Sequence, residues 1–546
     1  YMDTWDDYER SLTREGFPLW DYIVLTASNE NQAEGFRAQI NERLKAGLLP
    51  KKTHFAVIPD RDGKRVGSGG ATLGVIKYIA EHSGKSDFKD LRILVIHSGG
   101  DSKRVPQYSA LGKLFSPVPH KLKNGKSATL FDEFMMSMSS VPARIREGML
   151  LLSGDVLLLF NPLQIDYSGN GAAAISFKED VETGKNHGVF LRGEDGFVKK
   201  FLHKQSVDAL TKFGAVNEQG KVDIDTGAVI FSAEMLNSLN SLIDNKDSFD
   251  KYVNDTVRLS LYGDFLYPLA TDSTLEKFYN EKPEGSFCDE LKNARTEIWN
   301  VLRPYRMKLL RLSPAKFIHF GTTTEILELM SGGVDSYKEL GWSNHINSSI
   351  TKNTAGFNSV LSDKAKIGKN CYLEVSYVHS KAKIGENVLL SYIDIHDETI
   401  PSDVVIHGLK QKDGKFVARI YGVKDNPKET KLFGKELSAV FPETAFTDEE
   451  KTLWNAEIYP ACDSISEAVK EALNIYEIVN GDGDLEHLMS LERKSLQSGF
   501  NSADADAIIA WDNRMQDLVK MDGIAKLIRT GKPATEAKDI LKVSEL

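Results

Sequence analysis

Cysteine is scarce in this sequence. The 546 residues include only three cysteines, which lie far apart at Cys288, Cys371 and Cys462. An odd number of widely separated cysteines excludes a disulfide framework and metal sites of the CxxC type. The first residues also lack the basic-plus-apolar pattern of a signal segment. We therefore expect a reducing compartment and a cytoplasmic location.

Long apolar runs and an excess of positive charge are absent as well. The most apolar long stretch, 149–160, is interrupted by Asp155 and is too short to span a bilayer. The 78 acidic residues outnumber the 68 lysines and arginines, and the net charge of -10 argues against nucleic-acid and membrane partners. The composition, 41% hydrophobic and 27% charged, is typical of an ordered globular chain, long enough for two to four domains.

What the sequence does have is a glycine turn between a buried strand and a group of cations. The stretch Leu91 to Pro119 reads LRILVIHSGGDSKRVPQYSALGKLFSPVP, and its segment Ile93–Ile96 predicts a buried strand. Gly99 and Gly100 let the backbone turn sharply and approach a ligand closely. The polar residues that follow are Asp101, Ser102, Lys103, Arg104 and Lys113. This pattern favours phosphate binding, although a tight turn with solvated lysines explains the same residues.

A second glycine-rich loop follows a strand predicted at 54–58. It reads DRDGKRVGSGGAT over residues 60–72, and apolar residues at helical spacing come after it. A strand, a glycine loop and a helix start form a geometry that binds an anion or leaves room for a base. The loop is neither a GxGxxG nor a Walker A sequence. The alternative is a glycine-rich helix start whose Lys64 and Arg65 face solvent.

An acidic residue follows the next buried strand. Residues 149–155 read MLLLSGD, so Asp155 stands where that strand ends. Mg²⁺ needs few protein carboxylates, because it takes its other oxygens from water and phosphate. Asp155 is therefore a candidate magnesium ligand. The alternative is an aspartate that caps the following turn.

Three further segments pair polar residues with β-rich runs. They read NHGVF at 186–190, FVKKFLHK at 197–204 and VDIDTGAVIF at 222–231. Rigid strands that carry a few polar groups, with glycine for close approach, form sugar pockets. His187 taken alone is better explained as a hydrogen-bonded structural histidine than as a catalyst.

Together these motifs resemble the GDP-L-fucose pyrophosphorylase (L-fucose-1-phosphate guanylyltransferase) family, and above all the N-terminal part of its bifunctional L-fucokinase members. The resemblance covers about residues 20–460 and rests on HSGGDSKRVP…GK.FSPVP, KRVGSGGATL, SGD, NHGV, DTG and HFGT. It implies that Arg104 and Lys113 are the catalytic cations on the triphosphate and the sugar phosphate. The nucleotide-binding residues that it implies are Gly67, Gly69, Gly70, Thr72, Gly99, Gly100, Asp101, Ser102 and Lys103.

The resemblance also implies a sugar-phosphate site and a Mg²⁺ site. Lys204 is followed by Gln205, whereas related enzymes usually have a proline directly after this lysine. The metal ligands would be Asp155 and Asp264, and the alternative for Asp264 is an exposed acid at a helix start. The HFGT segment at 319–322 is interpreted as structural, because Thr322 and Glu325 form a capping box. The sugar-phosphate residues that the resemblance implies are Asn186, His187, Gly188, Lys204, Asp225, Thr226 and Gly227.

The predicted fold class is α/β. We expect a Rossmann-like sugar nucleotidyltransferase core, in which a mixed, mostly parallel sheet has helices on both faces, over residues 1–235. A helical and mixed annex would complete it over 236–345. The motif AKIG at 365 recurs at 382, and aliphatic residues six apart predict a short left-handed β-helix over 346–425. Residues 426–546 would form a helix-rich C-terminal region, either a linker to an absent kinase or a tail.

The implied reaction converts GTP and L-fucose 1-phosphate into GDP-L-fucose and diphosphate, with Mg²⁺ as cofactor. The alternatives are another sugar 1-phosphate (of the D-arabinose, mannose or glucose type), another base, or a catalytically silent nucleotide-binding scaffold. An acyltransferase with a histidine base is a further alternative, since the β-helix segment contains His379, His396 and His407. Further partner expectations are a homo-oligomer through the β-helix and a fused or separate L-fucokinase.

Overall fold

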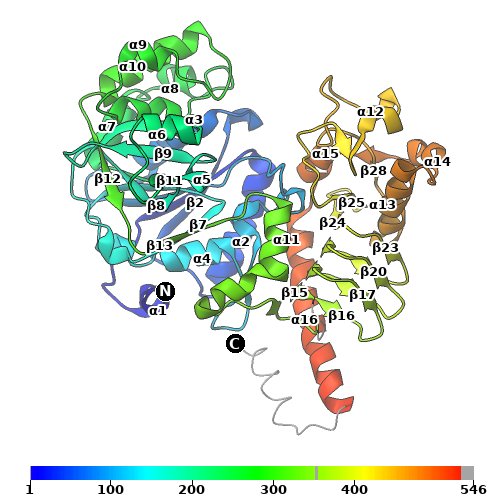
Figure 1. Ribbon diagram of the computed structural model, residues 1–546. Helices are drawn as coiled ribbons and strands as arrows, with labels where there is room; N and C mark the ends of the chain where they lie inside the picture. Colours follow the sequence, from blue (N-terminus) through cyan, green and yellow to red (C-terminus); the bar gives the residue numbers. More distant parts are fainter. Residues whose placement is uncertain (1, 204, 351–353, 530–546) are drawn as a thin grey trace. The chain divides into compact units, whose positions relative to one another are not determined.

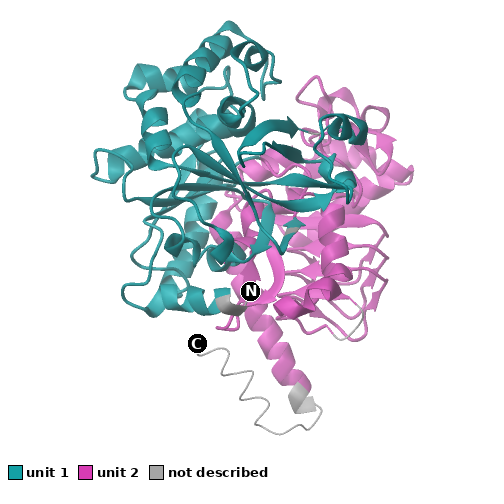
Figure 2. Cartoon of the chain, turned by 60° about the vertical axis from the view of Figure 1, so that its left-hand side comes forward, with its two compact units in different colours: residues 1–100, 133–319 teal, residues 101–132, 320–546 magenta. Residues whose placement is uncertain are grey.

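The computed structural model describes residues 2–203, 205–350 and 354–529. The chain forms two compact units (Figure 2). Unit 1 contains Tyr1–Gly100 and Glu133–His319, and unit 2 contains Asp101–Asp132 and Phe320–Leu546. The cation-rich segment after Gly100 therefore groups with the C-terminal half of the chain, which the sequence did not indicate. The four-part division by residue number stays a prediction.

Unit 1 is built on a nine-stranded mixed sheet with the order β10-β9-β11-β6-β3-β1-β2, in which β8 also pairs with β11 and β12 pairs with β8. The strands β2, β1, β3 and β6 run parallel, and β11 turns antiparallel to β6. The mixed sheet is as predicted, but it is not mostly parallel. The pairs of β11 with β8 and β9 and of β9 with β10 are antiparallel, while β12 pairs parallel with β8. The strands are β1 (Tyr22–Ala27), β2 (His54–Pro59), β3 (Arg92–His97), β6 (Gly148–Ser153), β8 (Ala172–Asp180), β9 (Gly188–Arg192), β10 (Val198–His203), β11 (Lys221–Phe231) and β12 (Met307–Arg311).

Helices bury both faces of this sheet. Ile93 and Val95 of β3 share one apolar cluster with α3, α7 and α10, whereas Leu94 and Ile96 point to the opposite face and are also 0% exposed. The helix α2 begins where the Asn29 side chain accepts the N–H of Gln32. The helices of this unit include α1 (Met2–Thr13), α2 (Glu30–Lys45), α3 (Gly67–His82), α5 (Val181–Gly184), α6 (Val207–Lys212), α7 (Ala233–Ser241), α8 (Lys246–Tyr252), α9 (Leu275–Tyr279) and α10 (Asp289–Leu302). The strands predicted at 54–58, 93–96 and 149–155 are thus confirmed to within a few residues.

A separate pair of strands lies beside the main sheet in unit 1. Strand β7 (Val156–Phe160) follows β6 directly and pairs antiparallel with β13 (Ala315–His319). In this register His319 stands opposite Val156, the residue after Asp155. The pairing therefore brings a histidine to the carboxyl end of β6.

Unit 2 contains three stacks of short parallel strands (Figure 1). Residues 17 apart pair in successive turns, as Lys366 does with Lys383 and Tyr377 with Asp394. The repeat predicted from AKIG is therefore a parallel, three-sided coil, while its left-handed sense stays a prediction. One stack is extended by the longer strands β24 (Val404–Lys410) and β25 (Phe416–Gly422), which are antiparallel. The stacks are β14 (His345–Ile346), β15 (Ala355–Phe357), β18 (Tyr372–Glu374) and β21 (Leu389–Ser391); β16 (Val360–Leu361), β19 (Tyr377–Val378) and β22 (Asp394–Ile395); and β17 (Lys366–Ile367), β20 (Lys383–Ile384) and β23 (Thr399–Ile400).

Helices accompany the coil in unit 2. The capping box predicted from Thr322 and Glu325 is present at the start of α11. Across the described parts of the chain, no helix has both the length and the apolar character needed to cross a membrane. The helices are α11 (Thr323–Ser331), α12 (Leu437–Val440), α13 (Ile465–Asn480), α14 (Leu485–Ser490), α15 (Leu496–Asn501) and α16 (Ala505–Arg529), and α4 (Leu130–Ser137) begins in this unit.

Candidate functional site

The carboxyl ends of the parallel strands of unit 1 meet at one edge of the sheet. The backbone N–H of Gly154 donates to the carbonyl of His97 at 3.0 Å. A Cβ added at Gly154 would lie 2.9 Å from that carbonyl oxygen, so only glycine fits between the two strand ends. The Ser98 hydroxyl donates to the Thr26 carbonyl at 2.8 Å. Strand ends in open α/β sheets are where such folds bind ligands.

Asp155 lies at this edge beside two histidines. The Ser153 hydroxyl donates to Oδ1 of Asp155 at 2.7 Å, and Nε2 of His319 lies 3.9 Å from Oδ2. The His187 and His319 rings meet edge to face, with centroids 6.2 Å apart. The Asp155 side chain is 26% exposed. The structure thus gathers one carboxylate and two imidazoles where the sequence assigned only Asp155 to a metal and His187 to a sugar.

The DTG segment forms an irregularity in β11 next to the same strand end. The register of β11 against β8 shifts between Asp225 and Val229, and Gly227 has φ of +72°. A Cβ at Gly227 would stand 3.0 Å from the Ser153 Cβ. Gly227 donates its N–H to Oδ1 of Asp225 at 2.9 Å. Burial raises the pKa of Asp225 to about 6, and the Gly227 hydrogen bond lowers it in part.

Aromatic side chains border this cluster. A Cβ at Gly188 would lie 2.7 Å from the Phe201 ring and 2.9 Å from the Asp225 Cβ. The rings of Phe201 and Tyr262 stack at 6.1 Å. The pKa of Tyr262 is raised well above its usual value by burial, and further by the charges of Asp225 and Asp155. A neutral phenol therefore lies beside two carboxylates, where it can donate a hydrogen bond.

The remaining predicted sugar-phosphate residues are Thr226, Asn186 and Lys204. Thr226 is 3% exposed, and its hydroxyl donates to the Ile175 carbonyl of β8 at 2.7 Å. This hydrogen bond gives Thr226 a structural role, and its assignment as a ligand-binding residue stays a prediction. Asn186 is exposed in the turn before β9, and Lys204 lies outside the described residues.

The glycine-rich loop at the start of α3 is filled by the chain itself. Gly67 has φ of +80°, and a Cβ there would lie 2.2 Å from the Leu259 carbonyl oxygen. The N–H groups of Gly69 and Gly70 both point at that oxygen, at 2.7 and 3.4 Å. These amides are thus bonded within the chain, and the nucleotide-binding role of the loop stays a prediction. The glycines instead allow the segment that contains Leu259 to pack against the helix start.

The other predicted nucleotide residues of unit 1 lie near the strand ends. The Thr72 hydroxyl donates to the Ser68 carbonyl at 2.9 Å and contacts Nε2 of His97 at 3.1 Å. Burial lowers the pKa of His97 to about 4, so its imidazole is neutral. The carbonyl of Gly100 accepts from Gln32 at 3.1 Å, while a Cβ at Gly100 would meet no described atom within 4 Å. The Gly99-Gly100 turn therefore stays open on that side, as a ligand-binding turn requires.

Asp264 is enclosed in the helical part of unit 1. It is 0% exposed, and its Oδ1 accepts from Nε of Arg295 at 2.8 Å while Oδ2 accepts the Ser260 N–H at 2.6 Å. Arg295 is 1% exposed. Removing one partner of such a buried pair would leave an uncompensated charge in the interior. The suggestion of a second metal ligand at Asp264 is therefore not supported by its contacts, and the exposed helix-start alternative is also wrong.

The predicted catalytic cations belong to unit 2, where a loop of 3₁₀ turns carries them. Arg104 is exposed, and Lys113 is half-buried at the start of a turn that follows Gly112. The Arg104 carbonyl accepts the N–H of Thr323 at 3.2 Å, so the loop is bonded to the start of α11. Of the predicted nucleotide residues here, Lys103 lies 3.8 Å from the Asp101 carboxylate and 5.4 Å from the Trp454 ring centroid.

Buried polar side chains of the coil form hydrogen bonds with this loop. Arg419 donates to the Pro106 carbonyl at 2.7 Å. Tyr421 donates to Oε1 of Gln107 at 2.8 Å, and the Tyr108 hydroxyl donates to Glu374 at 2.7 Å. Burial raises the pKa of Glu374 to about 7, and the hydroxyl donors lower it in part. Such a network fixes the backbone of the residues between Arg104 and Lys113.

The protein-family model described as "Fucose pyrophosphorylase domain" matches residues 85–464, more than half of the chain. The chain belongs to this family. The match spans the cation-rich loop, Asp155, the DTG segment and the coil, so the features just described are those of a fucose pyrophosphorylase domain.

Curated proteins with this domain are similar over most of the chain. The fucose-1-phosphate guanylyltransferase of Mus musculus is 25% identical, with 90% of this chain and 92% of that protein covered. The human protein of the same name is 25% identical over 84% of each chain. The bifunctional fucokinase/GDP-fucose pyrophosphorylase of Arabidopsis thaliana is 27% identical, over 58% of this chain and 32% of its own length.

Solved structures give a weaker similarity. The crystal structure of HddC from Yersinia pseudotuberculosis is 12% identical, with 60% of this chain and 82% of that chain covered and a TM-score of 0.27. A score of this size does not by itself establish a common fold.

Sequence reasoning missed two residues of the cluster around Asp155 and Asp225, namely His319 and Tyr262. His319 was grouped with a structural segment, and Tyr262 was passed over in favour of Asp264. The signal for His319 was its place at the end of a β-rich run, AKFIH. The pairing of β13 with β7, which places it beside Asp155, joins residues more than 150 positions apart. No local pattern contains that information.

Proposed function

We propose that this protein synthesises GDP-L-fucose from GTP and L-fucose 1-phosphate, with release of diphosphate. The observation that carries the proposal is the fucose pyrophosphorylase match over residues 85–464, supported by relatives named fucose-1-phosphate guanylyltransferase. The site of unit 1 and the cationic loop of unit 2 both fall within the matched range. The protein is thus a nucleotidyltransferase of nucleotide-sugar metabolism.

The reaction needs no covalent nucleophile from the protein. An oxygen of the sugar phosphate attacks the α-phosphorus of GTP in line, and diphosphate leaves from the opposite side. Such a transfer depends on positioning and on neutralising phosphate charge. In our proposal Arg104 and Lys113 supply that charge, as the sequence motif implies. Their loop has the rigidity for this role, because Thr323, Arg419 and Tyr421 bond to its backbone and to Gln107.

Asp155 has the character of a Mg²⁺ ligand. Its carboxylate is part-exposed and is oriented by the Ser153 hydroxyl. Mg²⁺ prefers such oxygen ligands and keeps several waters or phosphate oxygens in its shell. Asp155 would hold the ion, which would supply charge neutralisation at the phosphates. We leave Asp264 out of this site because its carboxylate is already bonded to Arg295.

The sugar would contact the strand cluster of unit 1. Above a pH of about 6 the Asp225 carboxylate is ionised and can accept a hydrogen bond from a hydroxyl. His187 and Tyr262 border the same cluster and can bond to hydroxyl or phosphate oxygens. Gly188 and Gly227 let the strands pack closely there, because a Cβ at either position would lie within 3.0 Å of the Asp225 or Ser153 side chain.

The proposal also includes the handedness of the coil, self-association, the location of the protein and its source of sugar phosphate. The coil would be left-handed and would mediate self-association. The protein would act in the cytoplasm, and an L-fucokinase, fused or separate, would supply the sugar phosphate. Of these, self-association is testable directly by light scattering of the full chain at several protein concentrations.

The decisive experiment is diphosphate release in the presence of Mg²⁺, with each of the four nucleoside triphosphates against L-fucose 1-phosphate, mannose 1-phosphate and glucose 1-phosphate. We expect a signal with GTP and L-fucose 1-phosphate. A signal confined to another pair would change the substrate and keep the reaction class. If the protein is folded and binds GTP but releases no diphosphate with any pair of substrates, the proposed enzymatic activity is wrong. That result would favour the scaffold alternative.

A further inference from the structure

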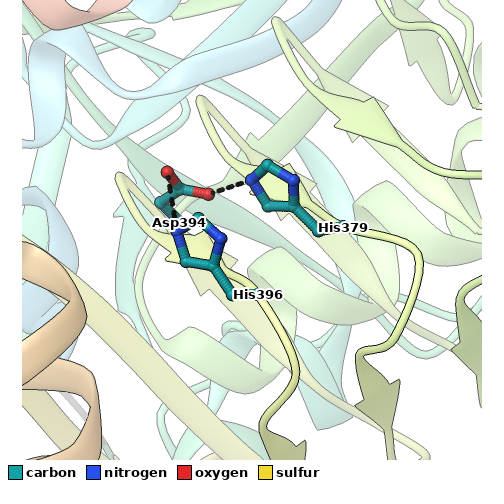
Figure 3. Close-up of side chains that lie close together, drawn as sticks. All are labelled: His379, Asp394 and His396. Carbon is teal, nitrogen blue, oxygen red and sulfur yellow. Dashed lines mark hydrogen bonds and ion pairs between the residues drawn. The ribbon is translucent and has the colours of Figure 1, made fainter.

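Two histidines repeat on the surface of the coil of unit 2. Tyr377 pairs with Asp394 in neighbouring turns, and His379 continues that register by donating its N–H to the Ile395 carbonyl at 2.8 Å. His379 and His396 therefore occupy equivalent places, 17 residues apart. Neighbouring parallel strands lie about 4.8 Å apart, so the two imidazoles stack, with centroids 4.2 Å and planes 14° apart (Figure 3).

A carboxylate completes the group. Asp394 stands two residues before His396 and so points to the same face of the coil. Its Oδ1 lies 2.8 Å from Nε2 of His379 and its Oδ2 lies 3.5 Å from Nε2 of His396 (Figure 3). Among the described residues, this is the one group of three His, Cys, Asp or Glu side chains whose ligand atoms all lie within 4.8 Å of one another.

We propose that His379, Asp394 and His396 bind a divalent transition-metal ion, of which Zn²⁺ is the representative. In tetrahedral zinc sites the metal lies about 2.0–2.2 Å from nitrogen and oxygen ligands, which places the ligand atoms about 3.3 Å from one another. The two contacts of Asp394, 2.8 and 3.5 Å, bracket that value. A water molecule would be the fourth ligand, since His396 is exposed.

One movement is needed to form the site. The lone pairs of stacked imidazoles are nearly parallel, so one ring must tilt out of the stack to point at the same ion as the other. The His396 side chain is 49% exposed and can make this rotation. His379 is held in place instead, because Tyr377 stacks on it with centroids 4.1 Å apart. The ion would thus bind to one fixed and one mobile imidazole.

The surrounding backbone supports this arrangement. Glu398 accepts the N–H groups of His396 and Asp397 at 2.8 and 3.1 Å and so fixes the corner from which His396 projects. Contacts of this kind orient ligands in metal sites. The two imidazole nitrogens favour zinc, copper, nickel or cobalt over Mg²⁺, which prefers oxygen. The site is therefore distinct in chemistry from the magnesium site that we propose at Asp155.

Metal bound here would join two successive turns of the coil. The ligands come from β19 and β22 and the corners that follow them, so the ion would cross-link two strands that otherwise share only short ladder pairing. Because the ligands bind in the folded coil and are scattered in the unfolded chain, the metal would stabilise the native state. This inference does not depend on the nucleotidyltransferase reaction.

The test is a zinc titration of the full chain, with a chromophoric chelator as competitor. We expect one equivalent of Zn²⁺ in the wild-type protein, and at least about tenfold weaker binding in His396→Ala and Asp394→Ala, since loss of outer contacts alone costs that much. The control is His487→Ala, which removes another exposed histidine, paired with Glu471 at 2.9 Å but outside the three-residue group. His487→Ala should bind zinc like wild type.

Two further readouts separate a metal site from a simple ion pair. Co²⁺ should give visible absorption bands in wild type and His487→Ala, and these bands should be lost in His396→Ala. Zinc should raise the melting temperature of wild type and His487→Ala but not that of His396→Ala, and excess Mg²⁺ should not displace it. Equal zinc affinity in wild type, His396→Ala and Asp394→Ala would overturn the proposal, as would displacement by Mg²⁺.

Discussion

Arg419 of the coil donates a hydrogen bond to the carbonyl of Pro106, between the two predicted catalytic cations in sequence. The same guanidinium contacts Nδ1 of His407 at 2.6 Å, and Arg419 is 0% exposed. Burial lowers the pKa of this arginine to about 10, and that of His407 falls well below its usual value. A charged Arg419 thus pairs with a neutral imidazole and a carbonyl, with the coil supporting the loop.

Replacing Arg419 tests that support. Arg419→Met should lower the free energy of unfolding by about 1–3 kcal/mol, because the Pro106 carbonyl and the His407 nitrogen lose their donor in the interior. Diphosphate release should fall as well, since the loop that carries Arg104 and Lys113 loses a fixed point. Arg146→Met is the control, as Arg146 is 72% exposed. Wild-type stability and activity in Arg419→Met would contradict the support.

Lys113 should affect turnover and not folding. Loss of one charge partner of the transition state lowers turnover by roughly 10²-fold. We expect Lys113→Ala to show this loss in the diphosphate assay, with an unchanged melting curve. The exposed Lys52 of unit 1 provides a matched control, Lys52→Ala. Full activity in Lys113→Ala would remove this residue from the catalytic set.

The two aspartates predicted to bind metal should differ in their effects. Asp264→Ala leaves the buried Arg295 without its carboxylate and should destabilise unit 1 by about 3–5 kcal/mol. Asp155→Ala should leave the unfolding curve nearly unchanged and abolish Mg²⁺-dependent diphosphate release. Unfolding in urea and the assay at several Mg²⁺ concentrations check both. The reverse pattern would restore Asp264 as a metal ligand.

Asp225 predicts a pH dependence of stability. Burial raises its pKa from 3.8 to about 6, so between these pH values the folded state binds more protons than the unfolded state. The stabilising effect of protonation is then lost as pH rises from 3.8 to about 6. The unfolding free energy of wild type relative to Asp225→Asn should fall across this window and level off above it. A difference in unfolding free energy that does not change with pH would show that folding does not raise the pKa of Asp225.

Two glycines should respond differently to a methyl group. Gly67→Ala places a Cβ 2.2 Å from the Leu259 carbonyl oxygen, against backbone that cannot move away cheaply, and should cost about 3 kcal/mol. Gly100→Ala meets no described atom within 4 Å and should cost only the strain of its φ of +111°, about 1–2 kcal/mol. Thermal unfolding of the two variants measures the difference. An equal cost would contradict the packing role of Gly67.

Much of the local structure follows from the sequence by itself. The buried strand before Gly99, the capping box of Thr322 and Glu325, and the 17-residue repeat of the coil were all predicted and are confirmed. Each depends on periodicity or on hydrogen bonds between residues a few positions apart, which the sequence contains directly. The motif residues that define the family are local in the same sense.

Only the tertiary structure decided which of the motif residues meet. Leu259 fills the glycine loop at Gly67, Arg295 neutralises Asp264, and His319 reaches Asp155 through a strand pair. Asp101 to Asp132 groups with the C-terminal unit, although it directly follows a strand of the first. These relations join residues tens to hundreds of positions apart, and they form because burial selects among many distant partners. A single sequence records the chemistry of each partner but not the choice between them.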